Sequence, residues 1–412
     1  MSASTPVYAD LSPDLILDAV ESKGFATNGH LLALNSYENR VYQIGIEERT
    51  FLVAKFYRPG RWEDAAILEE HAFARELIEA EIPVVAPLAD DHGDTLFTHA
   101  GFRFALYPRR GGRWPDLDDP DKLEWLGRFL GRIHAVGAIR PFAHRPTLDI
   151  ASFGTQSYQY LLEGGFIPAY IEVAYRTLAE DLLAAISAAY QRVGAIENIR
   201  LHGDCHPGNI LWTDDGPHFV DLDDCRMGPA VQDLWMLLSG DRQAMGLQLS
   251  EIVAGYELFR DFDRRELLLI EPLRTLRMLH YAAWLARRWD DPAFPQAFPW
   301  FNTSRYWEEH ILQLREQARV VPFDRSRPAR EALDVVVVPG AHLVRQALVS
   351  RHAQRLGDDQ RGAAPRPVFV VIDQRLRDAR VLRHSRAHGR VHEPVAQLEP
   401  PARERGEQVR IT

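Results

Sequence analysis

The segment from residue 202 to residue 224 constrains this chain more than any other part of it. It opens with His-Gly-Asp-Cys-His-Pro-Gly-Asn at 202–209 and closes with Val-Asp-Leu-Asp-Asp at 220–224. Between them, an apolar run, a polar turn and a second apolar run predict a β-hairpin. This hairpin would carry Asp221 back beside Asn209, and the Pro-Gly step before Asn209 suits a short rigid loop.

Two carboxylates and an amide in this order are the groups that phosphoryl transfer needs. One carboxylate orients a hydroxyl, and the amide holds Mg²⁺ together with the second carboxylate. A His-Gly-Asp triplet alone would be a weak signal. The triplet, the spaced Asn209 and the strand-borne Asp221 together make a specific one.

Length and composition describe an ordinary soluble globular protein. The chain has 412 residues, of which 46% are hydrophobic and 26% charged, enough for two lobes and an additional segment. No apolar run approaches the roughly 20 residues of a membrane span, and residues 1–10 lack signal-peptide features. We therefore expect a cytoplasmic, monomeric protein without membrane contact. The net charge of −10 argues against nucleic-acid binding.

Cys205 and Cys225 are the two cysteines of the sequence, and both lie within or next to the central segment. This count excludes a disulfide framework and a cysteine metal site. Cys205 has two interpretations. It is either a redox-sensitive thiol, activated by a nearby cation or histidine, or a small space-filling side chain, which we favour.

The N-terminal third predicts a small β-rich region followed by a helix. Strand-forming runs at 41–44 and 51–57 are separated by polar residues, and period-two alternation puts Lys55 on the same face of the second run as Val53. A lone lysine on such a strand usually reaches solvent. Residues 64–80 predict a helix that ends before Pro83 and contains two adjacent glutamates, at 69 and 70.

From residue 102 onward the pattern changes from strand to helix. Residues 102–108 predict a strand that leads into Gly111 and Gly112, a plausible interlobe hinge whose backbone could bind an adenine edge. A helix is expected at 119–137, with Asp119 as its N-cap and Pro120 as its first residue. Two more helices are expected, one that starts at Asp233 and one at 273–289. Helical patterns then dominate to about residue 321.

The last part of the chain differs in composition. All nine tryptophans and all thirteen tyrosines precede Arg325, and Phe369 is the one aromatic residue after it. Residues 325–412 hold 17 Arg against 10 Asp and Glu. Three interpretations remain open: a disordered tail, a weakly ordered appendage, or sequence translated past the natural stop. We assign this segment no function.

Segment 202–224 resembles the aminoglycoside phosphotransferase and choline kinase branch of the protein-kinase-like fold. Further stretches, at 34–42, 53–59, 67–71, 228–238 and 291–295, are similar to a group of bacterial stress response serine/threonine protein kinases. The resemblance extends from about residue 10 to residue 321. It implies an α+β, two-lobed protein-kinase-like fold, with a nucleotide-binding lobe at 1–107, a catalytic lobe at 108–322 and a tail at 323–412.

The resemblance also implies an activity, its cofactors and its site residues. The activity is ATP- and Mg²⁺-dependent phosphorylation of protein Ser and Thr hydroxyls, with autophosphorylation, in a stress response. The resemblance assigns Glu70, rather than Glu69, as the ion-pair partner of Lys55, because the family has this glutamate at the same distance in sequence before a proline, here Pro83. The implied site residues are the catalytic Asp204 and Asp221, Asn209 and Asp221 as metal ligands, and Ser36, Lys55 and Glu70 at the nucleotide.

Several neighbouring residues have weaker assignments. His206 stands where many protein kinases have a lysine near the γ-phosphate, and it either donates there or stabilises the loop. His202 is expected to anchor the loop through its ring. Asp223 is expected to contact the metal ligands rather than the metal itself. Asp224 is expected either to do the same or to face solvent.

One feature departs from the usual protein kinases. The turn at 35–39, Asn-Ser-Tyr-Glu-Asn, stands where those kinases have a Gly-x-Gly-x-x-Gly loop. Two rival functions stay open. One is a small-molecule kinase acting on an amino sugar, choline or a similar alcohol, and the other is a nucleotide-binding pseudokinase scaffold. The presence of Lys55, Asp204, Asn209 and Asp221 speaks against the scaffold.

Overall fold

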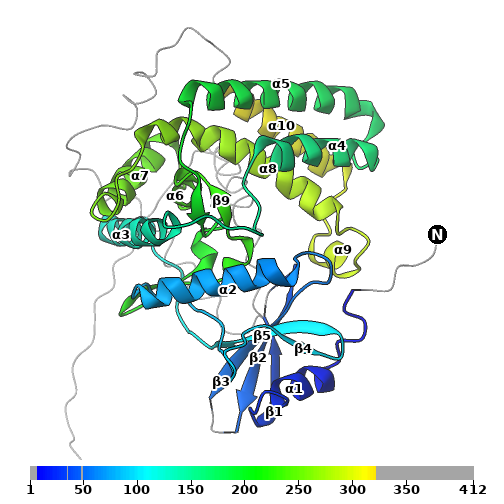
Figure 1. Ribbon diagram of the computed structural model, residues 1–412. Helices are drawn as coiled ribbons and strands as arrows, with labels where there is room; N and C mark the ends of the chain where they lie inside the picture. The colour runs from blue at the N-terminus through cyan, green and yellow to red at the C-terminus, as the bar shows by residue number, and fades with distance from the viewer. Residues whose placement is uncertain (1–6, 35, 48–49, 322–412) are drawn as a thin grey trace, which may run out of the picture. The chain divides into compact units, whose positions relative to one another are not determined.

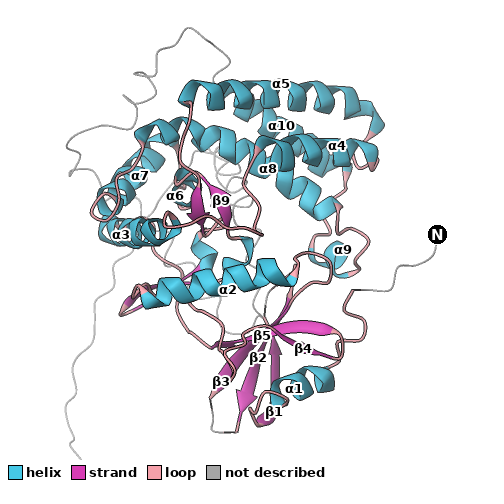
Figure 2. Ribbon diagram, in the orientation of Figure 1, coloured by secondary structure: helices cyan, strands magenta, loops and turns pink. Residues whose placement is uncertain are grey.

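The computed structural model describes residues 7–34, 36–47 and 50–321 of the chain. They form a sheet-based N-terminal lobe and a mainly helical C-terminal lobe, coloured by chain position in Figure 1 and by secondary structure in Figure 2. The predicted two-lobed α+β class is confirmed. The predicted tail, residues 323–412, lies outside the described residues.

The N-terminal lobe is built on a five-stranded antiparallel sheet of order β1-β2-β3-β5-β4. The strands predicted from apolar runs are present as β2 (Arg40–Ile46), β3 (Phe51–Phe56) and β5 (Phe102–Pro108). The sequence did not predict β1 (Thr27–Ala33), because most of its side chains are exposed, or β4 (Phe97–His99), because it is short. Helix α1 (Pro13–Glu21) was also missed.

The two faces of this sheet have different partners. Ala54, Phe56 and Phe104 pack with α1 in one buried cluster. Lys55 and its β5 partner Ala105 alternate with these residues and therefore face the other side, where Ala105 packs against helix α2 (Asp64–Glu79). Strand alternation thus points Lys55 toward α2, which lies between the sheet and the helical lobe in Figure 1.

The division predicted between residues 107 and 108 falls at the end of β5 and stays a prediction. Beyond it, the predicted helix α3 (Pro120–Gly137) begins with its Asp119 cap, which accepts a hydrogen bond from the backbone N–H of Asp121 at 3.1 Å. The remaining helices are α4 (Gln156–Glu163), α5 (Ala169–Val193), α6 (Val231–Trp235), α7 (Arg242–Tyr256), α8 (Ile270–Ala286), α9 (Ala293–Ala297) and α10 (Ser304–Val320).

Helix α6 differs from the expectation of a longer helix that starts at Asp233. It begins two residues earlier and ends at Trp235, because the next backbone N–H groups, of Leu237 and Leu238, bond three residues back rather than four. In the part of the chain that the structure describes, no helix combines the length and apolar character that a membrane crossing requires.

Two short β-ribbons complete the C-terminal lobe. The predicted hairpin is present as β7 (Ile210–Thr213) and β8 (Gly216–Phe219). Strand β6 (Ile199–Leu201) pairs with β9 (Arg226–Gly228). The segment 202–209 therefore leaves one ribbon and enters the other, which fixes both of its ends.

Helices α3 and α7 approach each other closely through glycines. A Cβ atom added to Gly127 would collide with the carbonyl oxygen of Ile252, and one added to Gly255 would collide with that of Glu124. Because these obstacles are backbone atoms, they cannot rotate away. This contact also places Tyr256, at the end of α7, against the buried face of α3.

We expect Gly127→Ala to lower the free energy of unfolding by about 1–3 kcal/mol, the usual cost of overpacking. Alanine is the better helix former by about 1 kcal/mol. Any net loss of stability must therefore come from the collision between the two helices. Urea unfolding measures the change. Gly111→Ala, whose added Cβ would meet one side-chain atom at 3.9 Å, is the control and should stay within about 0.5 kcal/mol. An unaltered Gly127→Ala midpoint would contradict the packing argument.

Candidate active site

Lys55 is buried among three carboxylates instead of reaching solvent. Its Nζ lies 3.1 Å from Asp221 Oδ1, 3.1 Å from Asp223 Oδ1 and 3.5 Å from Glu70 Oε1, and 8% of its side chain is exposed. Burial alone would lower the pKa of Lys55, but the Asp223, Glu70 and Asp221 carboxylates raise it well above its ordinary value. The lysine is therefore a permanent cation.

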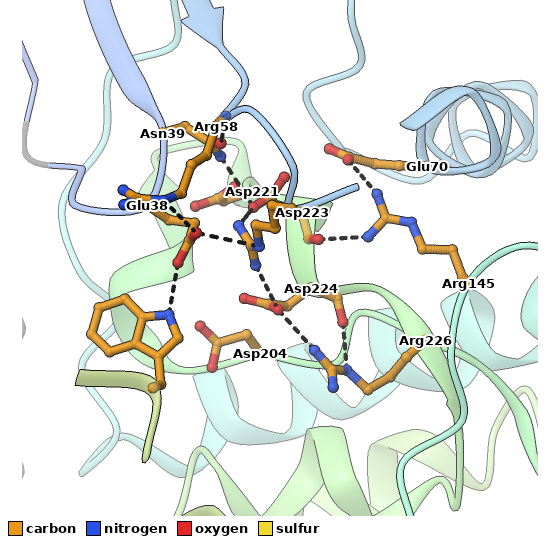
Figure 3. A network of polar contacts seen from close by, with 12 residues as sticks. Glu38, Asn39, Arg58, Glu70, Arg145, Asp204, Asp221, Asp223, Asp224 and Arg226 are labelled. Carbon is orange, nitrogen blue, oxygen red and sulfur yellow. Dashed lines mark hydrogen bonds and ion pairs between the residues drawn. The ribbon is translucent and has the colours of Figure 1, made fainter. Parts of the chain in front are cut away.

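The two adjacent glutamates of α2 have separate partners. Glu70 faces Lys55 on one side and accepts a 2.7 Å bond from Arg145 Nη2 on the other. Glu69 accepts the backbone N–H groups of residues 143–145 at 2.6–2.9 Å. The choice of Glu70 as the partner of Lys55 agrees with this geometry. Figure 3 shows Arg145 reaching from Glu70 toward Asp223, whose carbonyl it also bonds.

The segment 202–209 is braced by its own side chains. Asn209 Nδ2 donates to the carbonyl of Asp204 at 3.0 Å, and the N–H of Val220 donates to the carbonyl of Asn209 at 3.0 Å. His202 Nε2 lies 2.9 Å from the Val220 carbonyl, so its predicted anchoring role is confirmed. These bonds bring Asn209 and the residue before Asp221 side by side, as the hairpin predicted.

A buried aspartate that the sequence reasoning missed holds this segment from behind. Asp233 accepts the backbone N–H groups of His202 and Gly203 at 2.8 and 2.9 Å. It also contacts His134 Nε2 at 3.1 Å, and the other ring nitrogen of His134 meets the Tyr256 hydroxyl at 3.1 Å. No local pattern marks Asp233, because its partners come from α3 and from the loop at 202–203.

The backbone at Asp221 adopts an unusual conformation. Its φ and ψ are 61° and 62°, the left-handed region that non-glycine residues seldom adopt. Its side chain is 53% exposed, the most accessible of the carboxylates around Lys55. A strained, accessible carboxylate beside a buried cation is a plausible ligand for an additional positive group.

Asp223 and Asp224 belong to an arginine-rich network (Figure 3). Asp223 bonds Arg61 and accepts a 3.1 Å bond from Asn39 Nδ2. Burial would raise the pKa of Asp223, but the Arg61 and Lys55 charges lower it to about 2. Asp224 pairs with Arg61 at 2.9 Å and with Arg226 at 2.8 Å. Both carboxylates thus orient cations around Lys55 and Asp221.

The loop between β1 and β2 is held by distant side chains rather than by glycines. Glu38 accepts a 2.7 Å bond from Trp284 Nε1 and lies 2.6 Å from Arg288 Nε. Asn39 Oδ1 accepts the N–H of Arg58 at 3.0 Å. Glu38 was missed because its partners lie about 250 residues away in the sequence. Ser36 is half-buried in this loop, and its contact with ATP stays a prediction.

The carboxylate of Asp204 faces two nitrogen-bearing side chains. Arg277 Nη2 of α8 lies 2.6 Å from Oδ1, and His206 Nε2 lies 3.6 Å from Oδ2. His206 Nδ1 accepts the N–H of Gly208 at 3.0 Å, which is the loop-stabilising contact that was one of its two interpretations. Nothing in the local sequence pointed to Arg277.

Cys205 is completely buried, and burial raises the pKa of its thiol well above the ordinary value. A buried thiol of this kind stays protonated and unreactive. The space-filling interpretation therefore fits the structure, and the redox-sensitive one does not.

The donor set at the centre suits Mg²⁺ bound together with a substrate phosphate. Because Asn209 uses its amide nitrogen on Asp204, its oxygen is left for a cation beside the accessible Asp221. Within the described residues, no group of three or more His, Cys, Asp or Glu side chains forms a complete protein metal site. Mg²⁺ in nucleotide enzymes commonly takes one or two carboxylates and completes its shell with phosphates and water.

Comparison with known proteins agrees with this geometry. The family model described as "Phosphotransferase enzyme family" (APH) matches residues 30–269. Stress response kinase A of Escherichia coli strain K12 is 47% identical over 321 residues, which cover 78% of this chain and 97% of that protein. Serine/threonine protein kinase RdoA of Salmonella typhimurium strain LT2 is 45% identical, with the same coverage.

More distant solved structures share the fold. Amicoumacin kinase hAmiN, in complex with AMP-PNP, Ca²⁺ and Ami, superposes with a TM-score of 0.59 at 18% identity, covering 74% of this chain and 95% of its own. A spectinomycin phosphotransferase gives 0.53 at 14%, covering 78% and 97%. The predicted kinase-like fold is therefore confirmed. The chain belongs to the phosphotransferase enzyme family and, within it, is a kinase of the stress response kinase A group.

Proposed function

We propose that this chain is an ATP- and Mg²⁺-dependent protein kinase that phosphorylates Ser and Thr hydroxyls, its own included, in a stress response. One observation carries the proposal: Asp204, Asn209 and Asp221 lie together on a braced loop and hairpin, with the buried ammonium of Lys55 beside Asp221. The name of one relative, serine/threonine protein kinase RdoA, which is 45% identical and covered over 97% of its length, supports the protein substrate.

In this proposal Asp204 positions the acceptor hydroxyl and takes its proton. The oxygen then bonds to the γ-phosphorus, the bond from that phosphorus to the β-phosphate oxygen breaks, and ADP leaves. Lys55, oriented by Glu70, offsets the negative charge of the phosphates. Asn209 and Asp221 hold Mg²⁺, which supplies further charge neutralisation when bound.

The loop between β1 and β2 closes over the nucleotide in this assignment. Ser36 contacts a phosphate, and the bonds of Glu38 and Asn39 keep the loop in place without a glycine-rich sequence. ATP and protein substrates are the partners. Neither nucleic acid nor a membrane is required.

Incubation with labelled ATP and Mg²⁺ should place label on the protein itself and on a generic basic protein. The measurement is label retained on protein after denaturation, followed by identification of phosphoserine and phosphothreonine. The same reaction with an aminoglycoside, choline or an amino alcohol provides the comparison. Label on the small molecule alone would replace this proposal with a small-molecule kinase.

We expect Asp204→Asn to lower kcat at least about 100-fold, because an amide cannot take the proton of the acceptor. The affinity for AMP-PNP, measured by calorimetry, should change less than about threefold. Asp215→Asn, in the exposed hairpin turn, is the charge-matched control. Turnover close to that of the unmodified protein would remove Asp204 from its assigned role.

Removal of divalent cations by a chelator should stop transfer, and added Mg²⁺ should restore it. Asn209→Ala should raise the Mg²⁺ concentration at half-maximal activity by about tenfold or more, because it removes one of two protein ligands. Asn198→Ala, an exposed asparagine before β6, is the control. An Asn209→Ala protein with an unchanged Mg²⁺ requirement would exclude Asn209 as a ligand.

A further inference from the structure

Asp204, the proposed proton acceptor, is ion-paired before any substrate is present. Its side chain is 15% exposed, and Oδ1 lies 2.6 Å from Arg277 Nη2. Arg277 is itself 30% exposed, so this pair is largely shielded from water and only weakly screened by salt. Oδ2 has a more distant neighbour, because His206 Nε2 lies 3.6 Å away.

Arg277 approaches the Asp204 carboxylate more closely than His206 does: Arg277 Nη2 lies 2.6 Å from Oδ1, and His206 Nε2 lies 3.6 Å from Oδ2. The His206 Nδ1 atom already accepts the N–H of Gly208. The guanidinium of Arg277 supplies a positive charge at the same carboxylate from another element.

Helix α8 holds Arg277 rigidly. Leu276 and Leu279 on its other face are completely buried in the core of the C-terminal lobe. Trp284 lies seven residues after Arg277 and therefore on the same face, and it donates to Glu38 in the β1–β2 loop. One face of α8 thus contacts both the proposed base and the proposed nucleotide loop.

We propose that Arg277 is a positioning residue for phosphoryl transfer, and this proposal rests on the function proposed above. Its guanidinium fixes Oδ1 of Asp204 so that Oδ2 is presented to the acceptor hydroxyl. Arginine suits this task because its charge is permanent, so its attraction for the Asp204 carboxylate does not depend on pH. The charge also reduces repulsion between Asp204 and the phosphates of ATP.

Arg277→Ala should lower kcat about 10- to 100-fold, the usual effect of removing a partner that orients a reacting group. The KM for ATP should change less than about threefold, since Arg277 acts through Asp204. Arg277→Lys should retain more activity than Arg277→Ala. Added guanidinium ion should restore part of the kcat of Arg277→Ala and none of that of Asp204→Asn.

Arg274→Ala is the matched control. Arg274 lies on the same helix with 23% of its side chain exposed, but it pairs with Glu271. Its replacement should leave kcat within about twofold and be insensitive to guanidinium. A kcat for Arg277→Ala within twofold of the unmodified protein would overturn the proposal. So would an equal loss in Arg274→Ala, or a loss confined to KM.

A second measurement does not depend on kinase activity. In the nucleotide-free protein, a double-mutant cycle of Arg277→Ala and Asp204→Asn, followed by urea unfolding, should give non-additive midpoints, because both changes remove one ion pair. Additive midpoints would refute the pair. If the unmodified protein transfers label to no protein, the proposed protein substrate is wrong, but the role of Arg277 is still testable. The rate of ATP hydrolysis is then compared among the same variants.

Discussion

The buried ammonium of Lys55 is the interaction on which the rest of the site depends. Removing a charge from water costs several kcal/mol, so Lys55 remains inside because carboxylates from α2 and from residues 221–223 lie within 3.5 Å. Glu70 belongs to the N-terminal lobe, and Asp221 and Asp223 belong to the C-terminal lobe. One charge therefore ties both lobes together, at the place where the proposed function puts the phosphates of ATP.

The surrounding structure supports this charge cluster with backbone bonds from several elements. Asp233 fixes the N–H groups that precede Asp204, and Glu69 fixes the segment that carries Arg145. Glu38 attaches the β1–β2 loop to α8, the same helix that places Arg277 on Asp204. Polar groups from α8 and from the segment after β3 therefore hold the β1–β2 loop, which lacks a glycine-rich sequence.

Much of the fold followed from local patterns. The strands β2, β3 and β5, the helices α2 and α3 and the hairpin β7–β8 are marked by periodic apolar residues, by an Asp-Pro helix start or by turn residues. Strand β1 escaped because its side chains are mostly exposed, and α6 is shorter than expected because its final turn tightens. The pairing of Lys55 with Glu70 agrees with the sequence spacing, whereas their roles at the nucleotide stay predictions.

The sequence alone determined the order of the chemical groups: lysine on a strand, glutamate on a helix, and then a carboxylate, the amide and the second carboxylate around one hairpin. These depend on residue type and short spacing, which are visible locally. Only the tertiary structure decided which charges meet. Arg277, Glu38, Asp233 and Arg61 reach their partners from 30 to about 250 residues away. Such contacts depend on how helices and loops pack, and no local pattern records that packing.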